Sequence, residues 1–220
     1  MSNVYRTRQP AVAGNDLIRT PQREAYAALE TFEQTNGREA GVVLPVGCGK
    51  SGCIALALST ELRRAEIEAC DVSEEALEIA RINATRLGLV QRVQFRCSDL
   101  LALYPDGQFD LVVSNPPYVG ESEADKVQRQ VREFEPKIAV FSGWHGMDIY
   151  KRLIPQAYAA LKPGGWFVTE IGFSIEKQVK ECLTEWSDIQ TKADLQGIPR
   201  VIAARKPIKL TSNSEELVRS

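Results

Sequence analysis

Short apolar runs alternate with longer segments of helical periodicity along most of the 220-residue chain. Two strands of one sheet that are joined by a helix run parallel, and a parallel sheet is covered by helices on both faces. Its strands therefore appear as short, nearly continuous apolar runs. The expected strands are Gly41–Val46, Glu66–Cys70, Val93–Cys97, Phe109–Ser114 and Trp166–Ile171, and the expected helices lie at about 51–63, 73–87, 147–161 and 174–185. This pattern predicts an α/β fold with a mostly parallel sheet.

Local signals predict where several elements begin and end. Ser73 is an expected helix N-cap, and Gly88 is expected to stop the same helix. The run Lys162-Pro163-Gly164-Gly165 predicts a turn before the fifth strand. Further on, Ile189–Leu195 and Arg200–Arg205 predict an antiparallel pair of strands.

We expect one main domain between two extensions. Residues 1–40 are expected to form an N-terminal extension with one helix, residues 41–205 the main domain, and residues 206–220 a flexible tail. A chain of this length can bury one sizeable core, so a single domain is sufficient to organise it.

Charge and composition narrow the functional classes. Lys and Arg number 27 against 29 Asp and Glu, so the net charge of −2 provides no strong positive field for nucleic acid. No apolar run approaches the roughly 20 residues of a membrane helix, and the first residues lack the apolar core of a signal peptide. Five scattered cysteines and the single His145 argue against a disulfide framework and a multi-histidine metal site. We therefore expect a cytoplasmic protein without a membrane segment or a bound metal.

The segment that carries the most chemical information follows the fourth expected strand. There Ser114 is succeeded by Asn115, Pro116, Pro117 and Tyr118. The two prolines fix the backbone and remove two N–H donors. The Asn115 side-chain oxygen, together with the carbonyl of Asn115 or Pro116, can then accept both hydrogens of a planar NH₂ group. The Tyr118 ring can pack on the flat amide or base that carries this nitrogen, and aligning the nitrogen with a methyl donor would be catalysis by positioning.

Two acidic residues follow the second and third expected strands. Asp71 lies where a carboxylate can accept from both ribose hydroxyls of a nucleotide-like cofactor, and Asp99 lies where it can accept the exocyclic amine of adenine. Each residue also has a purely structural interpretation. Asp71 could cap the helix that begins near Ser73, and Asp99 could be an ordinary loop residue. Open α/β sheets bind ligands at the carboxyl ends of their strands, so these two acceptors together with Asn115 favour a ligand site.

Residues from about 52 to 205 resemble the HemK-type methyltransferases, which modify a glutamine in peptide chain release factors. The matching stretches besides Asn115–Tyr118 are residues 52–58, 71–77, 80–84, 132–136, 150–155, 161–166 and 194–201. The resemblance implies a Rossmann-like, seven-stranded fold that depends on S-adenosylmethionine. It implies that Asp71 holds the ribose and that Asp99 contacts the adenine. It also implies that Asn115 and Pro116 hold the glutamine amide, with Tyr118 packed against it.

The first glycine-rich loop departs from this family. The family has an acidic residue followed by Gly-x-Gly-x-Gly, whereas here Pro45 precedes Gly47, Gly49 and Gly52, with one extra residue before the last glycine. By family analogy these glycines, like Asn115, contact the cofactor, and the missing acid helps to hold its methionine end. The altered loop therefore predicts impaired binding of S-adenosylmethionine.

Residues 17–51 carry a second resemblance, to the opening of superfamily-two helicases. Residues 19–25 are similar to the glutamine-containing lead-in of those proteins, and Leu44–Ser51 is similar to their phosphate loop. Such a loop cradles phosphate with backbone N–H groups and a lysine. No apolar strand ending in an Asp-Glu pair follows, although a complete NTPase needs one for its metal. The two resemblances suggest a chimera in which only the helix at about 20–35 stands in place of the family's N-terminal recognition domain.

The main functional hypothesis is S-adenosylmethionine-dependent methylation of a glutamine side-chain amide in a release factor. An adenine-amino methyltransferase acting on DNA or RNA is one alternative, because the Asn-Pro-Pro-Tyr chemistry also serves an exocyclic amine and a flipped base can stack on Tyr118. An inactive or ATP-binding chimera is the other, based on Gly47–Ser51. The near-neutral charge favours the protein substrate. The sequence leaves the oligomeric state open.

Overall fold

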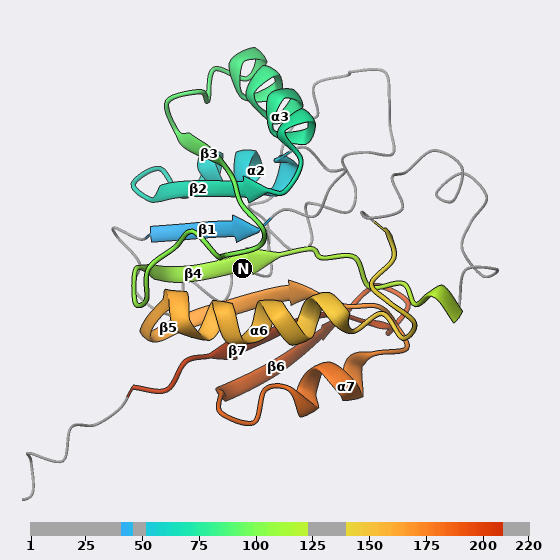
Figure 1. Ribbon diagram of the computed structural model, residues 1–220. Coiled ribbons are helices and arrows are strands. Elements are labelled where there is room, and N and C mark those ends of the chain that lie inside the picture. Colours follow the sequence, from blue (N-terminus) through green and yellow to red (C-terminus); the bar gives the residue numbers. More distant parts are fainter. Residues whose placement is uncertain (1–40, 46–51, 123–139, 209–220) are drawn as a thin grey trace, which may run out of the picture.

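The computed structural model describes residues 41–45, 52–122 and 140–208. Its centre is a seven-stranded sheet (Figure 1). The strand order is β3-β2-β1-β4-β5-β7-β6. The strands are β1 (Gly41–Pro45), β2 (Glu66–Asp71), β3 (Val93–Cys97), β4 (Phe109–Ser114), β5 (Leu161–Glu170), β6 (Ser187–Ala193) and β7 (Pro199–Arg205). Strands β1 to β5 pair in parallel, and β7 is antiparallel to both β5 and β6. The expected fold, a mostly parallel sheet with antiparallel C-terminal strands, is confirmed.

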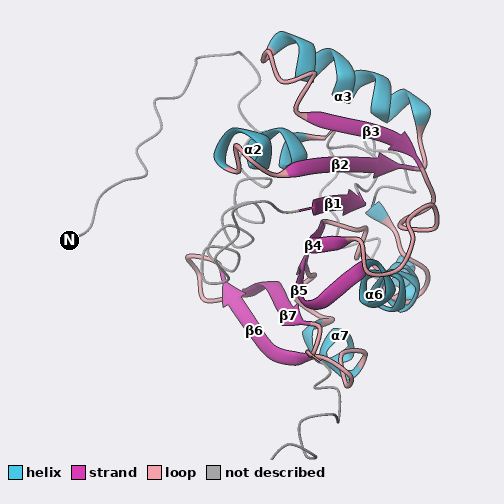
Figure 2. Cartoon of the chain, turned by 90° about the vertical axis from the view of Figure 1, so that its left-hand side faces the viewer, coloured by secondary structure: helices cyan, strands magenta, loops and turns pink. Residues whose placement is uncertain are grey.

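Helices cover both faces of the sheet. They are α2 (Cys53–Glu61), α3 (Glu74–Arg86), α6 (Asp148–Ala160) and α7 (Glu176–Glu181). Figure 2 shows α2 on one side of the sheet and α6 and α7 on the other. Side chains alternate across a strand, so Val42 and Leu44 of β1 belong to the core on the α2 side and Val43 to the core against α6 and α7. Burial on both faces is why β1, β4 and the middle of β5 are apolar runs rather than alternating residues.

The turn expected before the fifth strand is wrong as a separate element, because residues 162–165 lie within β5. The pairing of β4 with β5 jumps from Phe109–Leu161 to Leu111–Trp166, so these residues form an irregularity inside the strand. Backbone hydrogen bonds with the segment after β7 hold this irregular stretch in the sheet. Gly164 N donates to Lys206 O at 2.8 Å, and Lys206 N donates to Gly165 O at 2.8 Å. Hydrogen bonds of this kind keep a Pro-Gly-Gly run in the sheet despite its turn propensity.

The last helix is shorter than the sequence predicts. Its periodicity predicts a helix over 174–185, whereas α7 covers Glu176–Glu181 and residues 182–185 form turns. There Leu183 N donates to Lys180 O at 3.0 Å, a three-residue spacing that tightens the end of the helix. Leu183 is fully buried, so the apolar period continues although the α-helix does not.

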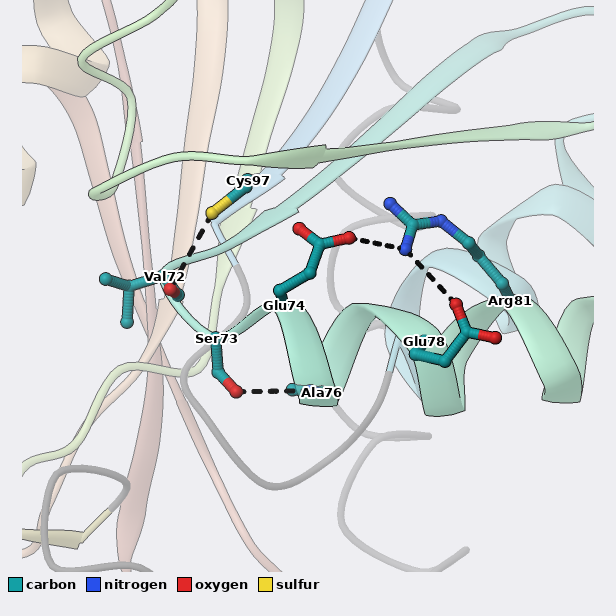
Figure 3. Close-up of polar contacts among 7 residues, drawn as sticks. All are labelled: Val72, Ser73, Glu74, Ala76, Glu78, Arg81 and Cys97. Carbon is teal, nitrogen blue, oxygen red and sulfur yellow. Dashed lines mark hydrogen bonds and ion pairs between the residues drawn. The ribbon is translucent and has the colours of Figure 1, made fainter.

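The start of α3 agrees with its sequence signals (Figure 3). Ser73 is the N-cap, and its Oγ accepts a hydrogen bond from Ala76 N at 3.2 Å. Glu74 and Glu78 both pair with Arg81, at 2.7 and 3.5 Å. These pairs are exposed and contribute little, whereas the cap satisfies a backbone donor that the helix cannot satisfy itself.

Replacing Ser73 with alanine is expected to lower the free energy of unfolding by about 1 kcal/mol, because the Ala76 N–H loses its acceptor. For a chain of this size the melting temperature should fall by about 2–4 °C. Ser73→Asp is the matched control, since aspartate caps as well as serine. Thermal denaturation of both variants is the measurement, and an S73D protein as unstable as S73A would contradict the capping role.

Several expectations lie outside the described residues. They are the helix in residues 1–40, the glycines at 47 and 49, and the tail from residue 209. Lys206, the first residue of the expected tail, donates through its Nζ to the backbone carbonyls of Tyr158 and Leu161. Across 41–45, 52–122 and 140–208, no helix has the length and apolarity needed to cross a membrane.

Candidate functional site

The predicted site residues follow strands whose carboxyl ends meet at one edge of the sheet. The strand β2 ends at Asp71, β3 is followed by Ser98 and Asp99, and β4 is followed by Asn115. The ends of β2 and β3 are joined directly, since Ser98 N donates to the Asp71 carbonyl at 2.9 Å. The structure therefore brings Asp71, Asp99 and the Asn115–Tyr118 segment to the same edge, the edge at which open α/β sheets bind ligands.

Asp71 is buried at this edge, with 3% of its surface exposed. Its Oδ1 accepts a hydrogen bond from Ser73 N at 2.8 Å, so Asp71 closes the turn before α3, whereas the helix itself is capped by Ser73. The bond uses one of several lone pairs of the carboxylate. Its predicted role at a ribose is compatible with this geometry and stays a prediction.

The neighbouring Cys70 is not a nucleophile. Its thiol is buried and donates to the Leu100 carbonyl at 3.2 Å. Burial raises the pKa of Cys70 to about 12, with a smaller opposing contribution from the Tyr104 hydroxyl. At neutral pH the thiol is therefore protonated and unreactive.

Asp99 lies at the surface rather than in the interior. Its carboxylate forms an ion pair with Arg152 of α6, and both side chains are about half exposed. The next turn is also tied to α6, because Leu101 N donates to Gln156 Oε1 at 2.8 Å. Sequence reasoning missed Arg152, since no local pattern indicates that α6 reaches the end of β3.

The Asn115–Tyr118 segment is largely enclosed. Pro116 and Pro117 are buried, while Asn115 and Tyr118 are partly buried. The Tyr118 hydroxyl donates to Oε1 of Glu170, the last residue of β5, at 3.1 Å. The ring also packs against Gly172, where a Cβ would lie 2.9 Å from Tyr118 Cδ2. Glu170 was not among the predicted site residues, although an acidic residue at the end of a strand is also the signal that pointed to Asp71.

A second segment holds the backbone that follows Tyr118. Val119 N donates to Val140 O at 3.1 Å, and Ser142 N donates to Val119 O at 3.0 Å. Gly146 approaches the same chain closely, because a Cβ there would lie 2.3 Å from the Tyr118 carbonyl oxygen. Tyr118 is thus fixed between the end of β5 and residues 140–146.

Gly146→Ala is expected to lower the melting temperature at least twice as much as Gly107→Ala. Both glycines have left-handed backbones, with φ of +76° and +67°, so both variants carry about 1–2 kcal/mol of strain. Only the new Cβ at 146 also collides with a backbone, since nothing lies within 4 Å of one at 107. Thermal denaturation of the two variants side by side is the measurement. Equal losses would show that residues 140–146 do not press on Tyr118.

Of the three glycines predicted at the cofactor, the described residues include Gly52. It precedes α2 with a φ of +74°, and a Cβ there would lie 3.0 Å from Ala80 Cβ and 3.2 Å from Phe95 Cε1. A larger residue would therefore push α2 away from α3 and β3. Gly47 and Gly49 fall in the part of the chain that the structure does not describe.

Comparison with known proteins identifies the family. The family model for the methyltransferase small domain matches residues 25–134. A release factor glutamine methyltransferase from Koribacter versatilis is 58% identical over 189 residues, which cover 85% of this chain and 66% of that protein. One from Rhodopirellula baltica is 36% identical, with 87% and 67% covered. The chain belongs to the release factor glutamine methyltransferase family. The chain spans just under two thirds of the first relatives' own length, with 66% and 65% covered.

Solved structures of other methyltransferases share the fold of this chain. A methyltransferase from Pyrococcus furiosus has a TM-score of 0.60 at 20% identity, with 86% of this chain and 84% of that chain covered. A SAM-dependent O-methyltransferase from Thermotoga maritima has a TM-score of 0.59 at 16% identity, with 87% and 67% covered. The family-model match begins at residue 25, so it includes part of the segment with helicase-like sequence.

Proposed function

We propose that this chain transfers a methyl group from S-adenosylmethionine to the side-chain amide nitrogen of a glutamine in a peptide chain release factor. The observation that carries the proposal is the Asn115–Tyr118 segment at the carboxyl end of β4, on the same edge of the sheet as the buried carboxylate of Asp71. The family membership supports both the reaction and the substrate class.

The residues at the edge fit this cofactor. The Asp71 carboxylate can accept from the two vicinal hydroxyls of a ribose. Gly52 has no side chain, so the backbone before α2 can approach the cofactor closely. We assign the ribose to Asp71, the adenine amine to Asp99, and further cofactor contacts to Gly47, Gly49, Gly52 and Asn115. When bound, S-adenosylmethionine would supply an electrophilic methyl group and leave as S-adenosylhomocysteine, while the amide nitrogen gives up one proton to solvent, so no metal is required.

The chain's own contribution is to orient the amide. Asn115 Oδ1 and the Pro116 carbonyl each accept one amide N–H, which fixes the plane of the NH₂ group. Pro117 keeps this turn rigid, because its ring fixes φ and it has no N–H to compete for those acceptors. The Tyr118 ring packs on one face of the amide. Holding the nitrogen in line with the methyl group removes orientational entropy from the step, which is catalysis by positioning.

Incubation with methyl-labelled S-adenosylmethionine tests the substrate class. We expect label on one glutamine of a release factor, located by mass spectrometry of peptides, and no label on adenine of DNA or RNA. Label on adenine alone would favour the adenine-amino alternative, which the same four residues could also serve. The net charge of −2 and the family of relatives favour the protein.

Calorimetry separates the cofactor from the nucleotide that the helicase-like loop would bind. We expect binding of S-adenosylmethionine and none of Mg-ATP. Tight binding of Mg-ATP would instead support a chimera with a working phosphate loop at Gly47–Ser51. Failure of both ligands to bind would mean that the fold lacks a working cofactor site.

Pro45→Asp combined with deletion of Lys50 is expected to tighten binding of S-adenosylmethionine by about tenfold, because it restores an acid for the cofactor's methionine end. Pro45 is the last residue of β1 and pairs with Cys70 in the sheet, beside Asp71. Calorimetric Kd values of the variant and the native chain are the measurement. Deletion of Lys50 alone serves as the control, and an unchanged Kd of the double change would contradict this account of the loop.

A cytoplasmic location accompanies the proposed function. Among the described residues, Cys70, Cys97 and Cys182 are free thiols. Reduced cysteines are usual in the cytoplasm, where thiol buffers prevent disulfide formation.

A further inference from the structure

A buried carboxylate lies beside the Asn115–Tyr118 segment. Glu170 ends β5 and is only 5% exposed, yet it is acidic. Its Oε1 accepts the hydrogen bond from the Tyr118 hydroxyl at 3.1 Å, and its Oε2 is buried without a hydrogen-bond partner in the described part of the chain. Burying a carboxylate with incomplete hydrogen bonding is unfavourable, so the fold alone gives little reason to keep one here.

The position of Glu170 is set by its backbone and not by Tyr118. Glu170 pairs with Val201 of β7, and its carbonyl accepts from the Tyr150 hydroxyl of α6 at 2.6 Å. Its carbonyl also accepts from Thr169 Oγ1 at 3.1 Å. The carboxylate is therefore anchored on a rigid strand, whereas Tyr118 lies outside any strand, after the two prolines.

Because the Glu170 carboxylate is anchored and Tyr118 is not, Glu170 fixes the position of Tyr118 rather than the reverse. A tyrosine ring pivots about its two side-chain torsions, and a fixed acceptor for the hydroxyl restricts both. Gly172 leaves the space in which the ring lies, since any Cβ there would collide with it. Glu170 holds the far end of the ring while Gly172 accommodates its edge.

We propose that Glu170 is a positioning residue that fixes the Tyr118 ring against the substrate amide, an inference that rests on the function proposed above. Loss of the acceptor lets the ring leave the orientation in which it packs on the amide held by Asn115 and Pro116. Methyl transfer then slows, although neither the cofactor nor the two amide acceptors are touched.

A double-mutant cycle in the full chain tests this role with methyl transfer to a release factor as the readout. Glu170→Leu keeps similar bulk and removes the acceptor, Glu170→Gln keeps an acceptor oxygen, and Tyr118→Phe removes the donor. We expect kcat to fall about tenfold in E170L and in Y118F, and about threefold or less in E170Q. The double variant E170L/Y118F should be no slower than the slower single variant, because both changes remove one interaction. The KM for S-adenosylmethionine should not change.

Three results would overturn the proposal. One is full activity of E170L, and a second is an E170Q protein as slow as E170L. The third is a further tenfold loss when E170L is added to Y118F, which would mean that Glu170 acts independently of Tyr118. If E170L does not fold, the same cycle with E170Q decides, since its small loss should vanish in the Y118F background.

A readout without turnover separates this inference from the proposed function. In tyrosine-labelled protein, the NMR signals of the Tyr118 ring should broaden or shift in E170L and return toward native values in E170Q. Unchanged ring signals in E170L would refute the positioning role even if the chain transfers no methyl group at all. Tyr158→Phe is the matched control, because the Tyr158 ring packs against Trp186 and Lys206, away from Tyr118 and Glu170. It should leave the Tyr118 signals in place.

Discussion

Asn115→Ala is expected to lower kcat for methyl transfer by at least about 100-fold while the chain stays folded. In the proposed mechanism the variant loses the side-chain oxygen that would accept one amide N–H, and the Pro116 carbonyl would be the remaining acceptor. The amide can then rotate away from the line of transfer, and a misplacement of about 1 Å can slow such a step about 100-fold. Methyl-transfer kinetics with a release factor are the measurement.

Asn83→Ala is the matched control for this variant. Asn83 lies on α3, is partly buried and is remote from the carboxyl edge of β4. Both variants should melt within about 2–4 °C of the native chain, since each loses a partly buried amide. Native turnover by N115A would show that Asn115 has no role in the reaction. An equal loss of kcat in N83A would show that the effect arises from lower stability.

Asp71→Asn is expected to raise the Kd for S-adenosylmethionine about 30-fold. The asparagine oxygen can still accept from Ser73 N, so the turn before α3 is kept. The lost carboxylate oxygen is replaced by an NH₂ group, which cannot accept from a ribose hydroxyl, and the remaining bonds are no longer charge-assisted. Calorimetric titration measures the change.

The control for this variant is Asp106→Asn, in the exposed turn before β4. It makes the same chemical change away from the edge where the site lies, so its Kd should match that of the native chain. A native Kd in D71N would show that Asp71 serves only the turn before α3.

The fold could be predicted largely from the sequence because burial on both faces makes the central strands β1 and β4 nearly continuous apolar runs. The bounds of β3 and β4 agree residue for residue with the expectation. The start of β5 does not, because the bonds that keep Gly164 and Gly165 in the sheet come from Lys206, which no local pattern connects with them. The shortened α7 has a different cause, since its apolar period continues into turns.

For the candidate site, residues could be proposed from the sequence, whereas their neighbours could not. Asp71 and Asn115 were chosen as candidates because each follows a strand, and strand ends meet at one edge. Arg152 and Glu170 were missed because their contacts depend on how α6 and β5 lie against β3 and β4. Only the packing of distant segments brings these charges to Asp99 and Tyr118.

The order of the strands along the chain means that the candidate site is completed late in translation. The last strand, β7, pairs with β5 along its length, and Glu170 faces Val201 there. Asn115 and Tyr118 are translated well before Val201, so a nascent chain can contain all the proposed catalytic side chains while β5 still lacks one neighbour. Non-local pairings of this kind form late in folding. Emerging chains are therefore expected to gain a competent site only after the C-terminal hairpin of β6 and β7 has left the exit tunnel.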